Sequence, residues 1–289
     1  PMIHPTVIGG DSFLQLRVDH GTTATVSGYR REPFLRFEAD GSVFENRASV
    51  TFATSTSRYG ANLPAGFDER ATPDWHRVAT NGEYAWHDHH IHWMSNVLPP
   101  GKRPGDVVLR SRLPMTVDGA AVVVTVQSVW AASASRLPVW LGAAGGLGVA
   151  LVVGLQRGHR WSGLAMVAVA VLATVVGWWQ YASFPASTGP RPVWLVLPLV
   201  AALTASAAVA AQTILTRAAL LTLSDVNLLL WAWMRRNGFS RAVLPTNAPG
   251  WLDRFAAAMA LACGPVVMAF GMAILAVAVL APRRLTSVT

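Results

Sequence analysis

The chain has 289 residues, of which 52% are hydrophobic and only 13% are charged, about half the charged fraction of an ordinary soluble domain. Acidic and basic residues balance in 1–136, whereas 137–289 carries ten arginines against Asp225 and Asp253, so all of the net charge of +8 lies among apolar segments. This pattern is typical of arginines at a membrane interface and argues against nucleic-acid binding, which needs a basic patch on a soluble part.

The chain opens with Pro1-Met2-Ile3-His4-Pro5 and shows no signal peptide. Because proline is an unusual translational start, we expect that a leader has been removed and that the protein is exported. The single cysteine, Cys263, lies in an apolar segment, so cysteine usage does not indicate the redox compartment.

Residues 12–130 contain short segments of β-forming residues separated by turn signals, without a helical period. Hairpins are expected around Asp40-Gly41, Asn81-Gly82 and Asp118-Gly119, because these dipeptides suit two-residue turns. The pattern predicts an all-β N-terminal sandwich of immunoglobulin or cupredoxin size. Besides a loop over 55–74, we expect strands at 12–18, 22–28, 33–38, 42–45, 48–53, 75–80, 83–87, 106–115 and 120–130.

A short linker, 131–135, and Arg136 separate this part from long apolar segments. We therefore expect a β domain over 1–136 and a transmembrane helical domain over 137–289, since each segment has about the 20 residues that span a bilayer. The expected spans are 137–155, 162–182, 193–215, 218–234 and 252–281.

The segment 218–234 differs from the other spans, because Ser224, Asp225 and Asn227 lie at its centre and a charge there costs a few kcal/mol. It is either a span with a polar face against protein or a helix at the interface. Five spans divide the ten arginines equally between the two sides, whereas four spans place seven inside, as the positive-inside rule prefers. We expect five spans in the plasma membrane, because the segment has span length, with the N-terminal domain extracytoplasmic.

Four of the eight histidines fall within six residues, in the segment Trp86-His87-Asp88-His89-His90-Ile91-His92-Trp93-Met94. Imidazole is the commonest metal ligand in proteins, and thioether sulfur favours copper. We predict a metal site, with copper preferred to zinc, whose candidate ligands are His87, His89, His92, Met94, Asp88 and His90. His76, His4 and His20 are further histidines that folding can bring near the cluster.

Backbone conformation decides how these ligands combine. If the segment is extended, His87 and His89 share one face, while Asp88, His90, His92 and Met94 share the other. If the segment is irregular, both sets can converge on one ion. The alternative without a metal is a polar, solvated edge with hydrogen-bonded histidines.

Several segments resemble a family of uncharacterised bacterial exported membrane proteins associated with copper handling. The family pattern is Trp-His-Asp-His-Arg, one variable residue, then His-Trp-Met, and His90 stands here where arginine is usual. The resemblance implies export and membrane anchoring, and it makes His90 the least essential of the histidines. The matching residues are Gly28–Phe37, Asp40-Gly41, Glu45-Asn46, Arg58-Tyr59-Gly60 and Tyr84–Ser95.

These observations favour a non-catalytic copper-binding or copper-delivery protein that docks onto a copper-dependent membrane oxidase or monooxygenase complex. No nucleophile motif or phosphate loop is present, so no catalytic residue is assigned. Two alternatives remain: a structural subunit in which the histidines make polar contacts, and a catalytic subunit of a membrane copper oxidase or monooxygenase.

Overall fold

The computed structural model describes residues 2–55, 61–68, 70–95, 97–156 and 159–280. Arg58, Tyr59 and Gly60 of the family resemblance, and Arg157, Arg283 and Arg284 of the arginine count, lie outside the described residues. The chain divides into two compact units. The β unit contains 1–133, 183–190 and 242–247, and the helical unit contains 134–182, 191–241 and 248–289.

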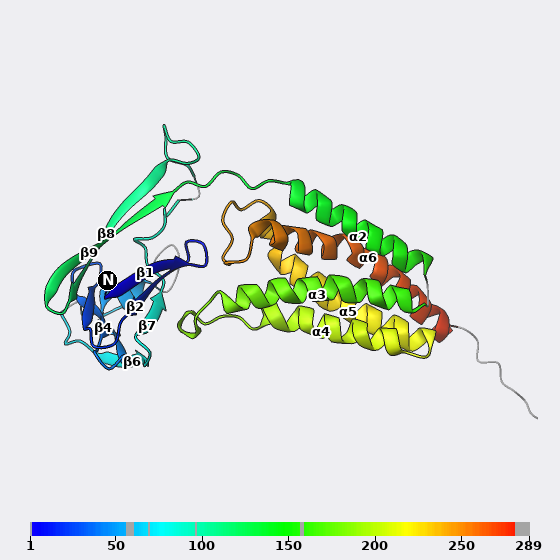
Figure 1. The fold of residues 1–289 in the computed structure, drawn as a ribbon, viewed down its shortest axis with the longest axis horizontal. Coiled ribbons are helices and arrows are strands. Elements are labelled where there is room, and N and C mark those ends of the chain that lie inside the picture. Colours follow the sequence, from blue (N-terminus) through cyan, green and yellow to red (C-terminus); the bar gives the residue numbers. More distant parts are fainter. Residues whose placement is uncertain (1, 56–60, 69, 96, 157–158, 281–289) are drawn as a thin grey trace, which may run out of the picture. The chain divides into compact units, whose positions relative to one another are not determined.

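The part of the β unit that the structure describes holds two antiparallel sheets (Figure 1), which confirms the predicted all-β sandwich. The three-stranded sheet has the order β1-β2-β7, and the six-stranded sheet has the order β6-β5-β4-β3-β8-β9. The strands are β1 (Ile3–Ile8), β2 (Phe13–Val18), β3 (Ala24–Ser27), β4 (Pro33–Phe37), β5 (Val43–Asn46), β6 (Trp75–Ala79), β7 (Glu83–Trp86), β8 (Val107–Val117) and β9 (Ala120–Val129).

Alternating apolar side chains from both sheets form the core of the sandwich. Every second residue is buried in β2 and in the last part of β8, at Leu113, Met115 and Val117, which is the period expected of a strand with one face covered. Trp86 and Ile91, which flank residues 87–90 of the histidine segment, belong to this same core. The segment is thus fixed at two points by apolar burial.

The predicted hairpin around Asn81-Gly82 is wrong. β6 pairs with β5 in the six-stranded sheet, whereas β7 pairs with β2 in the three-stranded sheet. Gly82 has a positive φ of 69°, as the turn signal requires, but the chain uses this turn to cross from one sheet to the other. The hairpins at Asp40-Gly41 and Asp118-Gly119 form as predicted, between β4 and β5 and between β8 and β9.

Two further differences concern local structure. The expected strand at 48–53 is instead the short helix α1 (Val50–Thr54), because the Ser49 side chain caps it by accepting the Phe52 backbone N–H at 3.0 Å. Strand β1 was not predicted, since Pro5 interrupts its pattern. Proline is tolerated at a sheet edge, and β1 is one of the two edge strands of its sheet.

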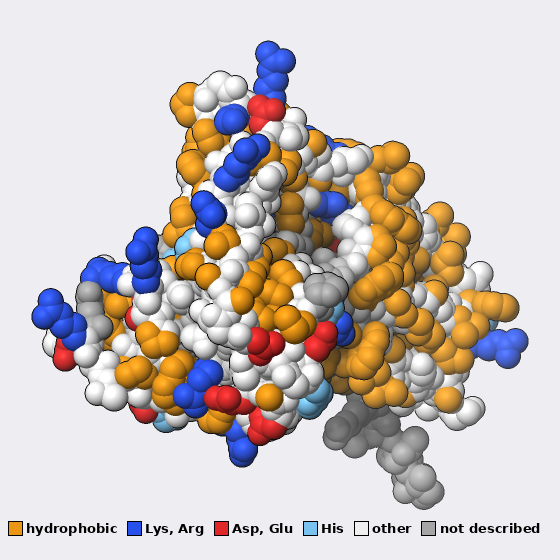
Figure 2. Space-filling model, turned by 60° about the vertical axis from the view of Figure 1, so that its left-hand side comes forward, with side chains coloured by type: hydrophobic (Ala, Val, Ile, Leu, Met, Phe, Trp, Pro, Cys, Tyr) orange, Lys and Arg blue, Asp and Glu red, His pale blue; other side chains and the backbone are white. Residues whose placement is uncertain are grey.

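Among its described residues, the helical unit has five helices that are long and apolar enough to cross a membrane, so this is a membrane protein. They are α2 (Leu137–Leu155), α3 (Arg160–Ala182), α4 (Val193–Ala210), α5 (Ile214–Arg235) and α6 (Gly250–Leu280). α2 packs along α6 and α3 along α4 (Figure 1). Figure 2 shows hydrophobic side chains over most of the visible helical surface, whereas acidic and basic side chains gather on the β unit.

The chain segments that make up the β unit distinguish the four-span topology from the five-span topology. It includes the α3–α4 connection at 183–190 and the α5–α6 connection at 242–247, and the Asn247 backbone N–H donates to Ser183 Oγ at 3.0 Å. Both connections must therefore lie on one side of the membrane. That requires α5 to cross, because an interfacial α5 would place them on opposite sides.

Glycine permits the close approach of α2 to α6. A Cβ added to Gly142 would lie 2.2 Å from the Phe255 carbonyl oxygen, and one added to Gly146 would lie 2.3 Å from that of Met259. Such small residues allow membrane helices to pack through their backbones.

We expect Gly146→Val to lower the free energy of unfolding by about 1–3 kcal/mol, because the added carbons must separate the two helices. Gly148→Val is the matched control on the same helix, since no atom lies within 4 Å of its added Cβ. Unfolding of the purified protein in mild detergent measures both. Equal stability of the two variants would contradict this packing.

A buried ion pair and its neighbours connect α3, α4, α5 and α6. Arg235 of α5 pairs with Asp253 of α6 and donates to the side-chain oxygen of Gln180 of α3. Its guanidinium lies against two indole rings, 5.3 Å from the Trp194 ring centre and 4.9 Å from that of Trp231. Arg235 and Asp253 are both buried, so α3, α4, α5 and α6 meet at one arginine.

Candidate metal centre

The histidine segment begins where strand β7 ends, at Trp86, and it is not extended. Residues 87 and 88 are irregular, 89 and 90 form a turn, and 91 and 92 form a bend. The Asp88 side chain causes this turn, because its Oδ1 accepts the His90 backbone N–H at 2.8 Å, a local bond that competes with the strand ladder. The other oxygen, Oδ2, accepts the Trp86 indole N–H at 2.9 Å. The condition for two separate ligand faces is therefore not met.

The turn brings three imidazole rings together. The centres of the His87 and His92 rings are 5.0 Å apart, those of His87 and His89 are 5.3 Å apart, and those of His89 and His92 are 6.0 Å apart. With metal–nitrogen distances of roughly 2.0–2.1 Å, ring centres around one ion lie about 4.5–6 Å apart. His92 is fully buried, and the other two rings are partly buried.

The spacing of the rings fits a metal, but the rings are not already set around one point. Among the described residues, no three His, Cys, Asp or Glu side chains form a ready metal-binding group. Because the ring centres already have the spacing that a metal needs, we expect occupancy to require rotation of the imidazoles about their side-chain bonds.

A backbone carbonyl fixes the tautomer of His87. Nδ1 of His87 lies 2.8 Å from the Ser12 carbonyl oxygen, which can only accept, so Nδ1 carries the proton and donates. The lone pair of the neutral ring is then on Nε2. This is the arrangement that orients metal-binding histidines in known sites, and Ser12 was not predicted from sequence.

Tyr29 supports His89 in two ways. The phenol ring stacks on the imidazole, with ring centres 5.5 Å apart and planes 9° apart. The phenol oxygen also accepts the His89 backbone N–H at 2.9 Å and lies 3.0 Å from Ser55 Oγ. Burial and the nearby Asp88 raise the pKa of Tyr29 well above its usual value, so the phenol stays protonated. The family resemblance includes Tyr29 but gives it no role.

Asp88 and His90 form a pair of their own. The Asp88 carboxylate lies 2.7 Å from His90 Nδ1 and is almost completely buried. Burial acts to raise the pKa of Asp88, but hydrogen bonds from His90 and Trp86 outweigh it and hold that pKa below its usual value. The same bond to Asp88 raises the pKa of His90. These two candidate ligands therefore bond to each other and stabilise the turn.

The remaining candidates lie elsewhere. Met94 has 40% of its surface exposed. His76 lies on β6 in the other sheet, with Nε2 2.9 Å from an Asp74 carboxylate oxygen, and His4 pairs with Asp19 at 3.1 Å. The geometry thus brings together His87, His89 and His92 out of the longer set of predicted ligands.

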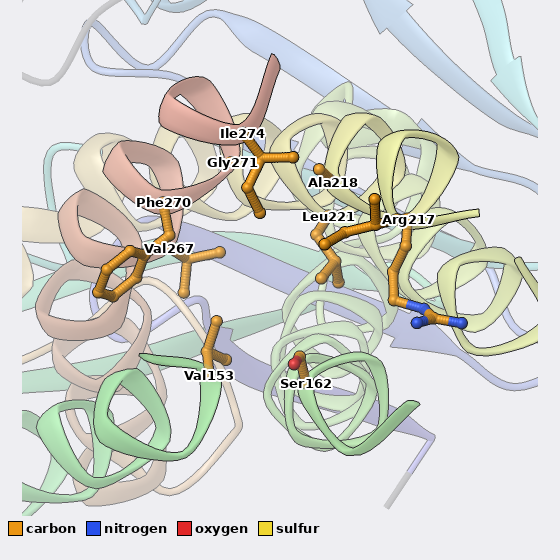
Figure 3. A pocket seen from close by; sticks show the side chains of 10 residues that line it. Val153, Ser162, Arg217, Ala218, Leu221, Val267, Phe270, Gly271 and Ile274 are labelled. Carbon is orange, nitrogen blue, oxygen red and sulfur yellow. The ribbon is translucent and has the colours of Figure 1, made fainter. Parts of the chain in front are cut away.

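The helical unit offers no comparable set of ligands among its described residues. Its pocket in Figure 3 is almost entirely apolar, and the Arg217 guanidinium at its edge donates to the carbonyl oxygens of Ala208 and Ala211 at the end of α4. Asp225 is fully buried in α5, and neither carboxylate oxygen has a hydrogen-bond partner among the described residues. Its neighbour Ser224 donates to the Ala201 carbonyl at 2.8 Å.

Comparison of the chain with protein-family models, curated proteins and solved structures finds no match. Function is therefore inferred from the chemistry and geometry of the site itself.

Proposed function

We propose that this membrane protein binds copper through His87, His89 and His92 and serves as a copper-binding or copper-delivery subunit. The observation that carries the proposal is the set of ring-centre distances of 5.0–6.0 Å among three imidazoles that come from one short turn. Ser12 and Tyr29 supply the outer contacts that such a site needs to keep its ligands oriented.

Copper is preferred to zinc for two reasons. Imidazole nitrogen suits both metals, but copper(II) forms the more stable complexes with a given set of nitrogen ligands. The resemblance of Tyr84–Ser95 to a copper-associated family points the same way. Carboxylate ligation would favour harder ions, and the carboxylate within the segment, Asp88, is held by His90 and Trp86.

The proposed role is accessory and non-catalytic. Three histidine ligands can retain and transfer a copper ion, and the sequence shows no substrate-binding constellation beside them. The helices anchor the β unit, with its histidines on the extracytoplasmic side, next to a copper-dependent oxidase or monooxygenase in the same membrane. Glycine and alanine in the helices, such as Gly148 with open space beside it, leave room for a partner helix.

Metal analysis of the full-length protein tests the proposal. The purified chain in detergent, incubated with copper and zinc together and then desalted, should retain a single copper ion. The His87→Ala/His89→Ala double variant is the control and should retain none. Zinc retained in place of copper would overturn the choice of metal. No retained metal in the parent chain would overturn the proposal and leave the structural-subunit alternative.

A further inference from the structure

A connection between two membrane helices forms part of the support of the metal centre. Residues 183–190, between α3 and α4, belong to the β unit. Within that unit the Phe184 ring stands edge-on to the Phe13 ring, with ring centres 5.9 Å apart and planes at 81°. Phe13 in turn stands edge-on to the imidazole of His87, with ring centres 6.2 Å apart. One aromatic ring thus separates the helix connection from a proposed ligand.

The same connection packs against a second turn, residues 9–12 between β1 and β2, which carries the Ser12 carbonyl that accepts from His87. Gly9 has a φ of 63°, and a Cβ added to it would lie 2.5 Å from Cε1 of Phe184. The Ser12 hydroxyl closes this turn by donating to the Gly9 carbonyl at 2.8 Å, and the Ser12 carbonyl accepts from His87. Phe184 therefore contacts both routes to His87, through Phe13 and through the backbone of the turn.

Two more contacts fix the connection in place. The Ser187 hydroxyl, in the short helix η1 (Ala186–Thr188), accepts the Ala85 backbone N–H of edge strand β7 at 3.3 Å. Ser183 Oγ accepts the Asn247 N–H of the other connection, whose Val243 and Leu244 lie against Gly10. The Gly9-Gly10 pair lacks side chains where both connections approach it.

We propose that Phe184 is a positioning residue for the ligand His87, so that the metal centre is completed by a connection between membrane helices. This inference rests on the proposed function. It implies that residues 1–133 alone hold an incomplete site. It also links His87 to the end of α3, because Ser183 alone separates Phe184 from the last residue of that helix.

The test compares variants of the full-length protein in detergent. We expect Phe184→Ala to weaken copper(II) binding by about tenfold, the lower end of the loss seen when an outer partner of a ligand is removed. Its copper(II) electron paramagnetic resonance spectrum should also change. Phe184→Tyr keeps the ring and should restore both properties. Ala186→Ser, an exposed change in the same connection, is the matched control and should leave both unchanged.

A second readout does not depend on copper. Diethylpyrocarbonate acylates neutral imidazole nitrogen, and mass spectrometry gives the rate of this modification at each histidine. Phe184→Ala should raise the rate at His87 several-fold more than at His4. If the parent chain binds no copper, the proposed function fails and this rate alone decides the inference. Unchanged affinity and spectrum in a copper-binding Phe184→Ala variant, or an unchanged His87 rate, would overturn the positioning role.

Discussion

Replacement of His92 by alanine should lower copper affinity by more than about 100-fold, and so should replacement of His87 or His89. Loss of an outer partner already costs roughly 10–100-fold, and loss of a ligand costs more. The three variants should behave alike because the Asp88 turn brings the three rings to within 6.0 Å of one another. A copper titration against a competing chelator measures each affinity.

Two variants of the same segment serve as controls. His90→Arg should retain copper, because arginine can still donate to the buried Asp88 carboxylate and thereby keep the turn. Met94→Leu should also retain copper(II), since this exposed side chain is replaced by one of similar volume. An extended segment would instead make His92 independent of His87 and His89. Full affinity in His92→Ala would thus contradict the convergence of the three rings.

Replacement of Arg235 by leucine should lower the free energy of unfolding of the helical unit by about 3–5 kcal/mol. Removal of one member of a buried ion pair leaves the other charge without compensation, and here it leaves Asp253 buried between helices. The variant also loses the contact with Gln180 and the two indole faces. Unfolding in mild detergent, followed by tryptophan fluorescence, gives the change.

The double variant Arg235→Leu/Asp253→Leu distinguishes a lost pair from general damage to packing. It should be more stable than Arg235→Leu, because no charge then stays buried alone. Arg236→Leu, at the adjacent exposed position, should change the stability little. A double variant as unstable as the sum of the two single variants would show that the pair itself does not matter.

Much of the fold follows from local pattern. The apolar segments correspond to the helices α2 to α6, and two of three predicted hairpins form. The failure at Asn81-Gly82 has a clear cause. A turn dipeptide fixes φ at its glycine, but it does not decide whether the strands on its two sides pair with each other or with strands in different sheets. That choice depends on contacts distant in sequence.

The candidate metal centre was also predictable only in part. Clustered histidines are visible in the sequence, so residue type and spacing name His87, His89 and His92, but only within a longer list that also holds Asp88, His90 and Met94. Their arrangement is not predictable in this way, because it depends on the side-chain bonds of Asp88 to Trp86 and His90. Ser12 lies 75 positions from His87, and Tyr29 lies 60 positions from His89. Phe184, which reaches His87 through Phe13, lies 97 positions from it. No local signal points to them.

Electron paramagnetic resonance of the copper(II)-loaded full-length protein, prepared with ¹⁵N-labelled histidine, observes the proposed ligands themselves. We expect superhyperfine structure from three imidazole nitrogens that changes with the isotope and is reduced in His87→Ala, in His89→Ala and in His92→Ala. A copper signal that is insensitive to the isotope, or one that is unchanged in all three variants, would contradict a copper centre at these histidines.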